Sequence, residues 1–499
     1  MKTLQHLLKG FTLKQVMGST DCVIEKLCAD SREAAPRTCF VAIPGSQVDG
    51  HAYIPQAIAL GCRAIVCQAL PRDMDETVTY VIVDAAAHAL GHMAAQFYEQ
   101  PSKKLQVIAV TGTNGKTTLV HLLYQMAQQM GYKAGMLSTI CNKIVDQTHP
   151  STHTTPDSLH LQQLLQLMVA AGCQYCFMEA SSHAMVQERL AGTALAGAVF
   201  TNITHEHLDY HGTFSNYIQA KKKLFDALPS SAFALVNRQD KHHAMMLQNC
   251  KAQKYTFSLQ DPADFRGKIV SNTLQGLELE IGNQRVWMQL LGAFNASNLL
   301  AAAAAAQLMG LDQTESLMAL SAIPPILGRM NRVLHTQAHQ VIIDYAHTPD
   351  AIQKVLTTLR GMLPPSARIL TVMGCGGTRD KQKRPLMGKI LSVYSDIALF
   401  TSDNPRYETA QSIIQDMQQG VPPSAASKVR HIVDRAMAIQ TACTLATPQD
   451  VVLVAGKGHQ YYEESQGSKQ YFCEPELIQS FFLHKKPSGR CNQQEALKA

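Results

Sequence analysis

One stretch, VIAVTGTNGKTTLVHL at residues 107–122, most constrains how this chain can fold. Its β-branched apolar run ends at Val110, a glycine-rich turn follows, and Lys116 opens a segment of helical character. A strand, a glycine turn and a helix start form an anion site, because the backbone amides and the helix dipole favour negative charge there. Two residues separate the glycines where the usual GxxxxGK[ST] pattern has four. The stretch predicts a nucleotide site in an α/β domain, against the alternative of a plain structural turn.

The composition indicates a folded protein of several domains. The 499 residues suffice for about three domains, and 46% of them are hydrophobic, enough to build buried cores. The net charge of +6 comes without a dense basic stripe, so no nucleic-acid partner is expected. The 13 cysteines lack paired CxxC motifs at zinc spacing, which favours reduced thiols. The first residues lack a signal-peptide core, and no membrane insertion is expected, so we predict a cytoplasmic location.

Strand-like and helix-like segments alternate along the chain, as a parallel sheet with crossover helices requires. We expect a small α/β unit in residues 1–102, a central sheet domain in residues 103–330 and a second alternating domain in residues 331–499. Helices are predicted at residues 85–98, at residues 157–171 and from Pro385 onward, and residues 230–290 are expected to be β-rich. Polar residues follow several strands, which predicts functional sites at the carboxyl edges of the sheets.

Several polar side chains in the central domain are candidates to hold a metal ion beside the nucleotide. Lys116 is expected at the β- and γ-phosphates, and the Thr117 hydroxyl on Mg2+. Glu179 and His207 follow two further predicted strands, and a carboxylate beside a phosphate loop is the usual second Mg2+ anchor. An ordinary loop histidine is the alternative for His207. Zinc is less favoured, because the neighbouring histidines lack HExxH spacing.

Lys221 stands out from its neighbours Lys222 and Lys223. On a helix it lies four residues after Tyr217 and three before Leu224, within the apolar stripe, whereas Lys223 turns away. Burial disfavours the charged form of a lysine, so Lys221 has reason to be uncharged or modified. A solvated basic face is the alternative for all three lysines.

The C-terminal domain holds three polar clusters at predicted strand ends: DYAHTP at 344–349, GCGGTRDKQKR at 374–384 and SDNPRYE at 402–408. In the last cluster a proline fixes the turn and Arg406 is presented for a carboxylate, which a guanidinium binds in a bidentate fork. Ordinary polar loops are the alternative for each cluster. A phosphate loop in one domain and carboxylate-type sites in the next predict a reaction at the cleft between them.

Taken together, these motifs resemble those of the Mur ligases, the ATP-dependent amino-acid ligases of peptidoglycan precursor synthesis. The resemblance rests on GTNGKTT, EASSHAMVQERL, TNITHEHLDYHG, the NASN helix, DYAHTP and GKGH, and it spans residues 30–459 in order. DSR, TTPDSLHLQ and DNPR are similar to the branch that extends the UDP-linked muramoyl-dipeptide. The arginine of DNPR is typical of the enzymes that add meso-diaminopimelate and is missing from those that add lysine.

The resemblance implies a fold, a reaction and a set of partners. The fold is α/β with three domains: an N-terminal UDP-binding domain, a central P-loop domain and a C-terminal Rossmann-like domain. The D-glutamate carboxylate of UDP-N-acetylmuramoyl-L-alanyl-D-glutamate attacks ATP to give an acyl phosphate, which the amine of meso-diaminopimelate then attacks. ATP and Mg2+ are the implied cofactors, and the chain is expected to be a monomer.

The resemblance also implies roles for individual residues. The catalytic and metal-binding group comprises Lys116, Thr117, Glu179, His207 and a carbamylated Lys221. The ATP site comprises Gly112, Thr113, Asn114, Gly115, Lys116, Thr117, Thr118, Asn295, Arg329, Asp344 and His347. The UDP-linked substrate is assigned to Ser31, Arg32, Thr154, Thr155, Ser181, Gln187 and Arg189. The amino-acid substrate is assigned to Arg379, Asp403, Asn404, Arg406, Gly456 and Gln460.

Two positions depart from the family pattern. Gln460 stands where GKGHE would place an acid to meet an ammonium of diaminopimelate, and a neutral amide is a weaker partner. Glu463 and Glu464 are the nearby acids that could compensate. Thr378 in GGTRD replaces the more common aspartate, a change expected to be mild.

Three alternative functions remain at this stage. The lysine-adding ligase differs only in its amino acid. Folylpolyglutamate synthetase shares the GTNGKT loop and the carbamylated lysine but lacks an N-terminal UDP-binding unit. A P-loop ATPase or nucleotide-binding module would hydrolyse ATP without requiring the UDP-linked substrate.

Overall fold

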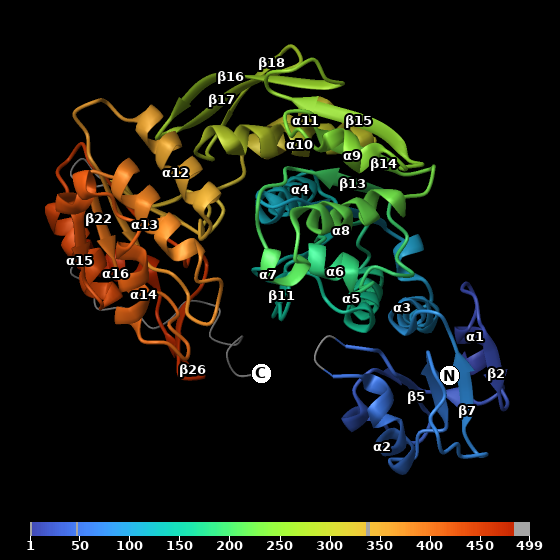
Figure 1. The fold of residues 1–499 in the computed structure, drawn as a ribbon. Coiled ribbons are helices and arrows are strands. Elements are labelled where there is room, and N and C mark those ends of the chain that lie inside the picture. The colour runs from blue at the N-terminus through green and yellow to red at the C-terminus, as the bar shows by residue number, and fades with distance from the viewer. Residues whose placement is uncertain (1, 46–47, 336–339, 484–499) are drawn as a thin grey trace. The chain divides into compact units, whose positions relative to one another are not determined.

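The computed structural model describes residues 2–45, 48–335 and 340–483 (Figure 1). The chain divides into two compact units. The first unit comprises Met1–Gly112, Leu123–Thr201 and Thr213–Tyr255, and the second comprises Thr113–Leu122, Asn202–Gly212 and Thr256–Ala499. The chain therefore passes from one unit to the other within the phosphate turn. None of the described helices has the length and apolar character that crossing a bilayer requires.

The N-terminal part of the first unit is a small α/β layer, as predicted. Its strand order is β2-β7-β6-β5-β4, with bounds β2 (Gln15–Met17), β4 (Lys26–Cys28), β5 (Thr38–Val41), β6 (Ala64–Cys67) and β7 (Thr79–Ile82). Within this five-stranded sheet β2 and β7 pair antiparallel, and the other neighbouring strands pair parallel. Helix α3 (Ala86–Phe97) buries its apolar side against Val41 and Val66, and α2 (Ile54–Ala59) packs with Phe40 and Ile65 of the opposite face. The helix predicted at residues 85–98 is confirmed.

The rest of the first unit is built on a parallel sheet with the phosphate strand at its centre. The strand order is β11-β10-β9-β12-β8-β13-β14-β15. The bounds are β8 (Gln106–Thr111), β9 (Ala134–Leu137), β12 (Tyr175–Glu179), β13 (Gly197–Phe200) and β14 (Phe233–Asn237). In register, Glu179 lies beside Val110 and Phe200 beside Thr111. The carboxyl ends of three strands, and the polar segments after them, therefore meet at one edge of the sheet.

Helices α5 (Ser158–Ala170) and α8 (Phe214–Asp226) belong to this unit, and α4 (Lys116–Gln129) begins directly after the phosphate turn. Helix α5 confirms the prediction for residues 157–171: the side chain of Asp157 caps its first turn by accepting from the His160 amide. An antiparallel hairpin, β10 (Asn142–Ile144) and β11 (Gln147–His149), extends the sheet at its edge and was not predicted.

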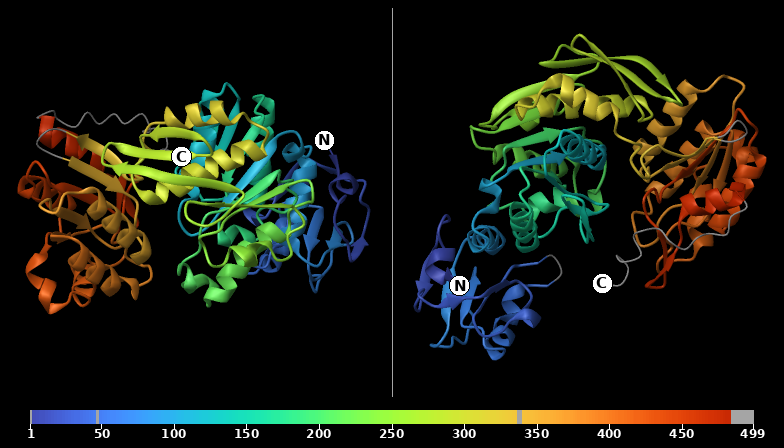
Figure 2. Two further views of the ribbon diagram at one scale, coloured as in Figure 1. Left: turned by 90° about the horizontal axis from the view of Figure 1, so that it is seen from above. Right: turned by 180° about the vertical axis from the view of Figure 1, so that it is seen from behind.

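The second unit begins with a run of strands. Strand β15 (Gln253–Ser258) leads to β16 (Phe265–Thr273), β17 (Gly276–Ile281) and β18 (Gln284–Met288). Strand β15 pairs parallel with β16, and β17 pairs antiparallel with both β16 and β18. This run confirms the β-rich prediction for residues 230–290. The alanine-rich helix α10 (Ala293–Leu308) lies along β16 and β17, and α11 (Gln313–Ser321) packs beside it (Figure 2). Small alanine side chains let α10 approach the strands closely, and its residues 299–306 are buried.

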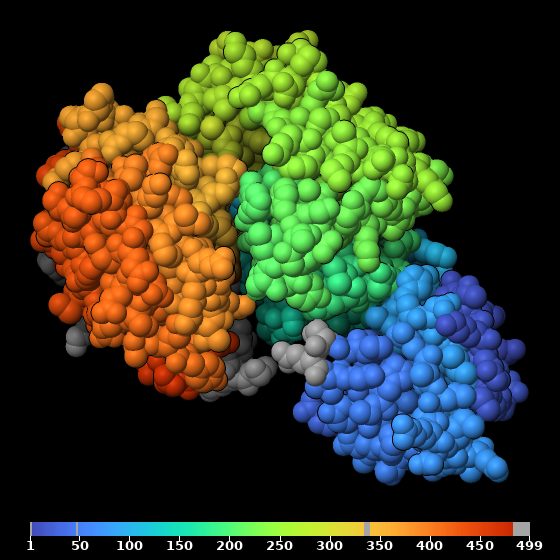
Figure 3. Space-filling model, viewed as in Figure 1, coloured from blue at the N-terminus to red at the C-terminus, as the bar shows by residue number. Residues whose placement is uncertain are grey.

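The remaining part of the second unit is a six-stranded sheet with the order β19-β20-β24-β21-β22-β23. Its strands are β19 (Asn331–His335), β20 (Gln340–Asp344), β21 (Ile369–Met373), β22 (Ile397–Phe400), β23 (Val429–His431) and β24 (Val451–Ala455). Its helices are α12 (Pro349–Met362), α13 (Lys383–Tyr394), α14 (Ala410–Gln418), α15 (Arg435–Leu445) and α16 (Glu474–Leu483). Figure 3 shows this part of the chain, coloured orange to red, as a closely packed surface.

The parallel pairing of β20, β24, β21 and β22 sets their carboxyl ends side by side. The three polar clusters predicted in the C-terminal domain therefore begin at the same sheet edge. Helix α13 starts at Lys383, two residues before the predicted Pro385, because a proline is tolerated within the first turn of a helix.

Candidate active site

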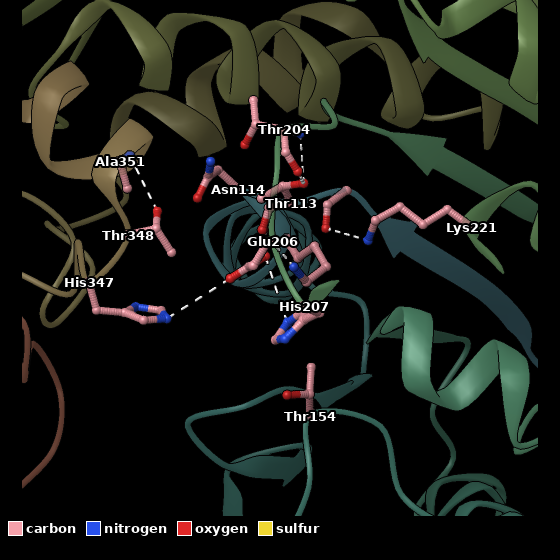
Figure 4. Close-up of polar contacts among 12 residues, drawn as sticks. Thr113, Asn114, Thr154, Thr204, Glu206, His207, Lys221, His347, Thr348 and Ala351 are labelled. Atoms are coloured by element: carbon pink, nitrogen blue, oxygen red, sulfur yellow. Dashed lines mark hydrogen bonds and ion pairs between the residues drawn. The ribbon is translucent and has the colours of Figure 1, made fainter. Parts of the chain in front are cut away.

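The phosphate turn is clamped to the segment that follows β13. Thr113 donates its amide to the Asn202 carbonyl at 2.8 Å, and its hydroxyl accepts from the Thr204 amide at 3.0 Å (Figure 4). The Asn114 amide donates to Asn202 Oδ1 at 3.1 Å, and Asn202 Nδ2 returns a bond to the Asn114 carbonyl. These paired bonds hold the turn in one conformation, so its backbone amides are preorganised.

Gly115 can only be glycine in this turn. Its φ is +89°, in the left-handed region, and a Cβ built there would lie 2.6 Å from Asn298 Oδ1. Asn298 in turn donates to Asn295 Oδ1 at 3.1 Å, and Asn295 donates to the Leu291 carbonyl at 2.7 Å. The structure thus connects the predicted Asn295 to the turn through Asn298, a residue that sequence reasoning missed.

Lys116 and Thr117 begin α4 with their side chains already engaged. Lys116 Nζ donates to the Thr113 carbonyl at 2.8 Å, so the ammonium folds back over the turn. Thr117 Oγ1 accepts from Arg329 Nη2 at 3.1 Å, which brings together two residues assigned to ATP. Thr118 is buried one residue further along α4.

Both carboxylate oxygens of Asp344, at the end of β20, accept hydrogen bonds from backbone amides. Oδ2 accepts from Met330 at 2.7 Å and Oδ1 accepts from Ala346 at 2.7 Å. Burial raises the pKa of Asp344, and the nearby Arg329 guanidinium opposes that rise. Arg329 also lies over the Tyr345 ring, 4.7 Å from its centroid. Asp344 thereby fixes the loop that carries Arg329 on one side and His347 on the other.

Glu206 is a further acid that sequence reasoning missed. It lies between two predicted residues: Oε2 is 3.7 Å from His207 Nε2 and Oε1 is 4.0 Å from His347 Nε2 (Figure 4). Burial lowers the pKa of His347, and the Lys383 cation adds to this effect. The signal that could have found Glu206 is its place inside the HEH run directly after a strand.

Asp350 is a second acid that sequence reasoning missed. Its Oδ2 accepts from Asn114 Nδ2 at 3.2 Å and from Thr204 Oγ1 at 3.4 Å. Lys354 Nζ, one turn along α12, donates to the same oxygen at 2.9 Å. Its position in the first turn of the helix after DYAHTP was the available signal.

In the first unit, the residues assigned to the muramoyl-dipeptide form one hydrogen-bonded group around Thr155. Its hydroxyl donates to the Glu179 carbonyl at 2.8 Å and accepts from the Ser181 amide at 3.0 Å. Arg189 donates to the Thr155 carbonyl at 2.6 Å, and its Nε and Nη2 both donate to Gln187 Oε1.

The strand-end carboxylate Glu179 is almost fully buried and accepts from the Thr139 amide at 2.8 Å. The Thr139 hydroxyl donates to the Thr154 hydroxyl at 3.1 Å. In the N-terminal layer, Ser31 donates to Gln56 at 2.8 Å. Arg32 donates hydrogen bonds to Asp30, and these bonds lower the pKa of the Asp30 carboxyl to about 2.

Lys221 is only 1% exposed on α8 and donates through Nζ to the Gly112 carbonyl at 2.8 Å (Figure 4). The Tyr217 ring lies 4.8 Å from the same nitrogen. Lys223 is exposed, as the helical stripe predicted. Lys222 is buried as well, against the expectation of a solvated face, because its ammonium pairs with Asp226 at 2.6 Å.

The residues assigned to the amino-acid substrate gather at the ends of β22 and β24. Asn404 donates to Gln460 Oε1 at 3.0 Å and accepts from the fully buried Lys457 at 2.9 Å. Lys457 also lies 3.5 Å from Asp403, and burial lowers its pKa while Asp403 opposes that shift. Gly456 has a φ of +108°, and a Cβ there would lie 2.9 Å from Asp403 Oδ2.

Arg406 and Arg379 complete this group. Arg406 Nη1 donates to the Gly377 carbonyl at 2.9 Å, and Nε donates to Glu464 at 3.1 Å. Arg379 is exposed on the glycine-rich loop that contains Gly377. Lys457 is a residue of this group that sequence reasoning missed, and Glu464 is one of the two acids that the sequence offered to compensate for Gln460.

Within residues 2–45, 48–335 and 340–483, no three His, Cys, Asp or Glu side chains converge on one point as a metal site does. The proposed Mg2+ ligands therefore stay a prediction. Of these residues, Thr117 and Glu179 offer the hydroxyl and carboxylate oxygens that Mg2+ prefers, whereas His207 offers a ring nitrogen.

Three family models match the chain in order. The model of the Mur ligase family catalytic domain matches residues 23–98, the Mur ligase middle domain matches residues 110–306, and the Mur ligase glutamate ligase domain matches residues 328–458. Together they confirm the predicted α/β fold of three domains.

Relatives and solved structures agree with these models. The chain is 46% identical to a UDP-N-acetylmuramoyl-L-alanyl-D-glutamate--2,6-diaminopimelate ligase of Phocaeicola vulgatus, over 96% of this chain and 99% of the relative. It is 47% identical to the ligase of the same name from Cytophaga hutchinsonii, over 95% and 98%. A solved structure of a ligase of that name is 29% identical, with a TM-score of 0.69, and covers 97% of this chain and 100% of its own.

The fold is also similar to a folylpolyglutamate synthase of Mycobacterium tuberculosis, at a TM-score of 0.59 and 16% identity, over 73% of this chain and 91% of the other. At that identity the likeness shows the fold alone. The family models, by contrast, cover each of the three domains, and the relatives match nearly the whole chain at identities above 40%. The chain therefore belongs to the Mur ligase family.

Proposed function

We propose that this chain is an ATP-dependent ligase that joins meso-diaminopimelate to UDP-N-acetylmuramoyl-L-alanyl-D-glutamate. The observation that carries the choice of amino acid is Arg406, a guanidinium held at the end of β22 beside Asp403 and Asn404. The relatives at 46% and 47% identity bear the name of the 2,6-diaminopimelate ligase, which supports the same choice. We further propose that the chain works as a cytoplasmic monomer.

The three domains divide the task. We assign the UDP-linked substrate to residues 1–102, ATP to residues 103–330 and the amino acid to residues 331–499, boundaries close to those of the family models. Ser31 and Arg32 would bind the UDP end. The group around Thr155 would bind the muramoyl-dipeptide and present its D-glutamate carboxylate.

The phosphate turn would hold ATP for attack by that carboxylate. Backbone amides of residues 112–118 would bind phosphate oxygens, with Lys116 neutralising the charge of the transferring phosphoryl group. Asn295, Arg329, Asp344 and His347 would hold the rest of the nucleotide. Two observations support this assignment: Arg329 donates a hydrogen bond to the Thr117 hydroxyl, and paired hydrogen bonds join the turn to Asn202.

Mg2+ would be held by Thr117, Glu179, His207 and the carbamate form of Lys221. When bound, the ion balances the charge on the phosphates. The hard oxygen donors among these residues and the burial of Glu179 and Lys221 support the assignment.

The second half of the reaction needs the amino acid to be oriented. The amine attacks the acyl phosphate, and the C–N bond forms as inorganic phosphate leaves. Arg406 would bind the distal carboxylate of meso-diaminopimelate, with Arg379, Asp403, Asn404, Gly456 and Gln460 around it. Lysine lacks that carboxylate and would leave the ligand-facing edge of the Arg406 guanidinium without a substrate partner, which disfavours its binding.

The test is an assay of the purified chain with ATP, the UDP-muramoyl-dipeptide and either meso-diaminopimelate or L-lysine. We expect a tripeptide product with meso-diaminopimelate only, and ATP turnover that depends on the dipeptide. Product with lysine alone would reverse the choice of amino acid. ATP turnover that ignores the dipeptide would refute the ligase assignment.

A matched pair of arginine variants locates the amino-acid site in the same assay. R406A should raise the KM for meso-diaminopimelate about tenfold or more, the loss of one charge-assisted pair, with the KM for ATP unchanged. R430A, which alters an exposed arginine on β23, should change neither constant. An unchanged KM in R406A would contradict the proposed role.

A further inference from the structure

The loop that carries Arg406 is fastened to the hairpin of β25 (Tyr462–Ser465) and β26 (Ser468–Tyr471). The Arg406 amide donates to the Glu464 carbonyl at 3.0 Å, and the Gln466 amide donates to the Arg406 carbonyl at 2.8 Å. The φ of Arg406 is +52°, an uncommon value for a residue with a side chain. These two backbone bonds therefore hold the guanidinium and the side chain of Glu464 in fixed register.

Arg406 and Glu464 form an ion pair that is neither buried nor fully solvated. Arg406 Nε lies 3.1 Å from Glu464 Oε2, and the two side chains are 19% and 23% exposed. Among the described residues, the hydrogen bonds of this guanidinium use Nε and Nη1. Those of the carboxylate use Oε2. Each partner therefore keeps an edge for a ligand.

The other acids of this cluster are already committed. Asp403 lies 3.5 Å from the ammonium of the buried Lys457. Glu463 accepts from the Ser402 hydroxyl at 2.6 Å. Gln460, which is uncharged, accepts a hydrogen bond through its side-chain oxygen from Asn404 Nδ2 at 3.0 Å. Glu464 is thus the acid of this group that pairs with Arg406.

A partly exposed positive group and a partly exposed negative group 3.1 Å apart complement one particular ligand chemistry. The amino-acid end of a molecule carries a carboxylate and an ammonium on a single carbon. A plain amine satisfies only the carboxylate of the pair, and a plain carboxylate satisfies only the guanidinium.

We propose that Arg406 and Glu464 together bind the distal zwitterion of the incoming diamino acid, with Arg406 on its carboxylate and Glu464 on its ammonium. This inference rests on the proposed function and adds a specificity-determining residue to it. Glu464 then supplies the negative charge that Gln460 lacks. The ion pair also keeps both side chains ordered before the substrate arrives, so less conformational entropy is lost on binding.

The test compares two substrates that differ only at the distal ammonium. meso-Diaminopimelate carries it, and L-2-aminopimelate has the same distal carboxylate without it. In E464Q we expect the KM for meso-diaminopimelate to rise about tenfold to a hundredfold, the effect of losing one charge-assisted bond. The KM for L-2-aminopimelate should stay the same or fall, and kcat with either substrate should change little.

Two further variants separate binding from structure. E464D keeps the charge and should retain most of the preference for meso-diaminopimelate. E463Q alters the neighbouring acid and should leave the ratio of the two KM values unchanged. Equal factors for both substrates in E464Q would show a structural role and overturn the inference. A wild-type chain that does not couple meso-diaminopimelate at all would instead overturn the proposed function, before any variant is measured.

Discussion

Lys221 Nζ donates a 2.8 Å hydrogen bond to the carbonyl oxygen of Gly112, the first glycine of the phosphate turn. The two residues are 109 positions apart in the chain. The lysine comes from an apolar helix stripe, with Tyr217 one turn earlier and 4.8 Å from its nitrogen. The buried Lys221 therefore contacts the turn that the proposed ATP site uses.

We predict that K221A abolishes ligation, with a loss of at least about a hundredfold in kcat, as expected when a preorganised charge is removed from the reacting phosphates. If the carbamate is the active form, millimolar acetate or formate should restore part of the activity by replacing its carboxylate. The measurement is the rate of tripeptide formation with and without the added carboxylate. K223A, which alters the exposed neighbour, should keep wild-type activity. Full activity in K221A without added carboxylate would refute the assignment.

Gly115 gives a sharper test of the turn itself. G115A must place a Cβ 2.6 Å from Asn298 Oδ1 at a φ of +89°. Backbone strain and the clash together should displace the turn and weaken ATP binding by about tenfold or more, since each left-handed non-glycine residue costs about 1 to 2 kcal/mol before any clash. Calorimetric titration with ATP measures this loss.

Gly131 is the matched control. Its φ is +85°, but a Cβ there meets nothing within 4 Å. G131A should therefore cost about 1 kcal/mol of unfolding free energy and leave ATP affinity unchanged. Equal ATP affinities in G115A and G131A would show that the packing of Asn298 on the turn is unimportant.

The phosphate turn and the sheet edges were predictable because a short run of neighbouring residues determines each of them. An apolar strand followed by polar residues marks a carboxyl edge wherever it occurs, and Glu179, Asp344 and Arg406 all obey that rule. Glu206 and Asp350 were missed because their significance depends on distant partners. Asn114 meets Asp350 across 236 positions, and no local pattern reports such a contact.

Lys222 illustrates a different limit. Helical periodicity separated Lys221 from Lys223 correctly, but it could not show that Lys222 is also buried. Its burial depends on Asp226 one turn later, which neutralises the ammonium and makes the low-dielectric site tolerable. The hairpin at residues 142–149 escaped prediction as well, since its short strands carry polar residues and gain their stability from pairing with β9.

The ion pair between Arg435 and Glu474 predicts a large effect on stability. The two side chains are fully buried, 2.6 Å apart, and Arg435 also donates to the Ser402 and Ala455 carbonyls. Burial raises the pKa of Glu474, and the charge of Arg435 opposes that rise. E474A leaves the guanidinium uncompensated and should lower the free energy of unfolding by about 3 to 5 kcal/mol.

Urea unfolding of E474A, R435M and the double variant R435M/E474L would measure this pair. The double variant should lose less than E474A alone, because apolar side chains of similar volume leave no buried charge unpaired. A loss below about 1 kcal/mol in E474A would contradict the prediction, since such a value is typical of an exposed pair.

Asp450 predicts how stability depends on pH. Burial alone would raise the pKa of this carboxyl, but hydrogen bonds from Arg368 and Thr447 outweigh burial and lower it from 3.8 to about 2. The folded chain therefore binds fewer protons than the unfolded chain between those values. The contribution to stability is full above about pH 4 and is lost as pH falls through 2, and it amounts to about 2 kcal/mol. In urea unfolding, D450N should be less stable than wild type by about that amount at pH 7, and the difference should shrink toward pH 2. A difference that stays constant from pH 7 to pH 2 would show that the charge of Asp450 does not stabilise the fold.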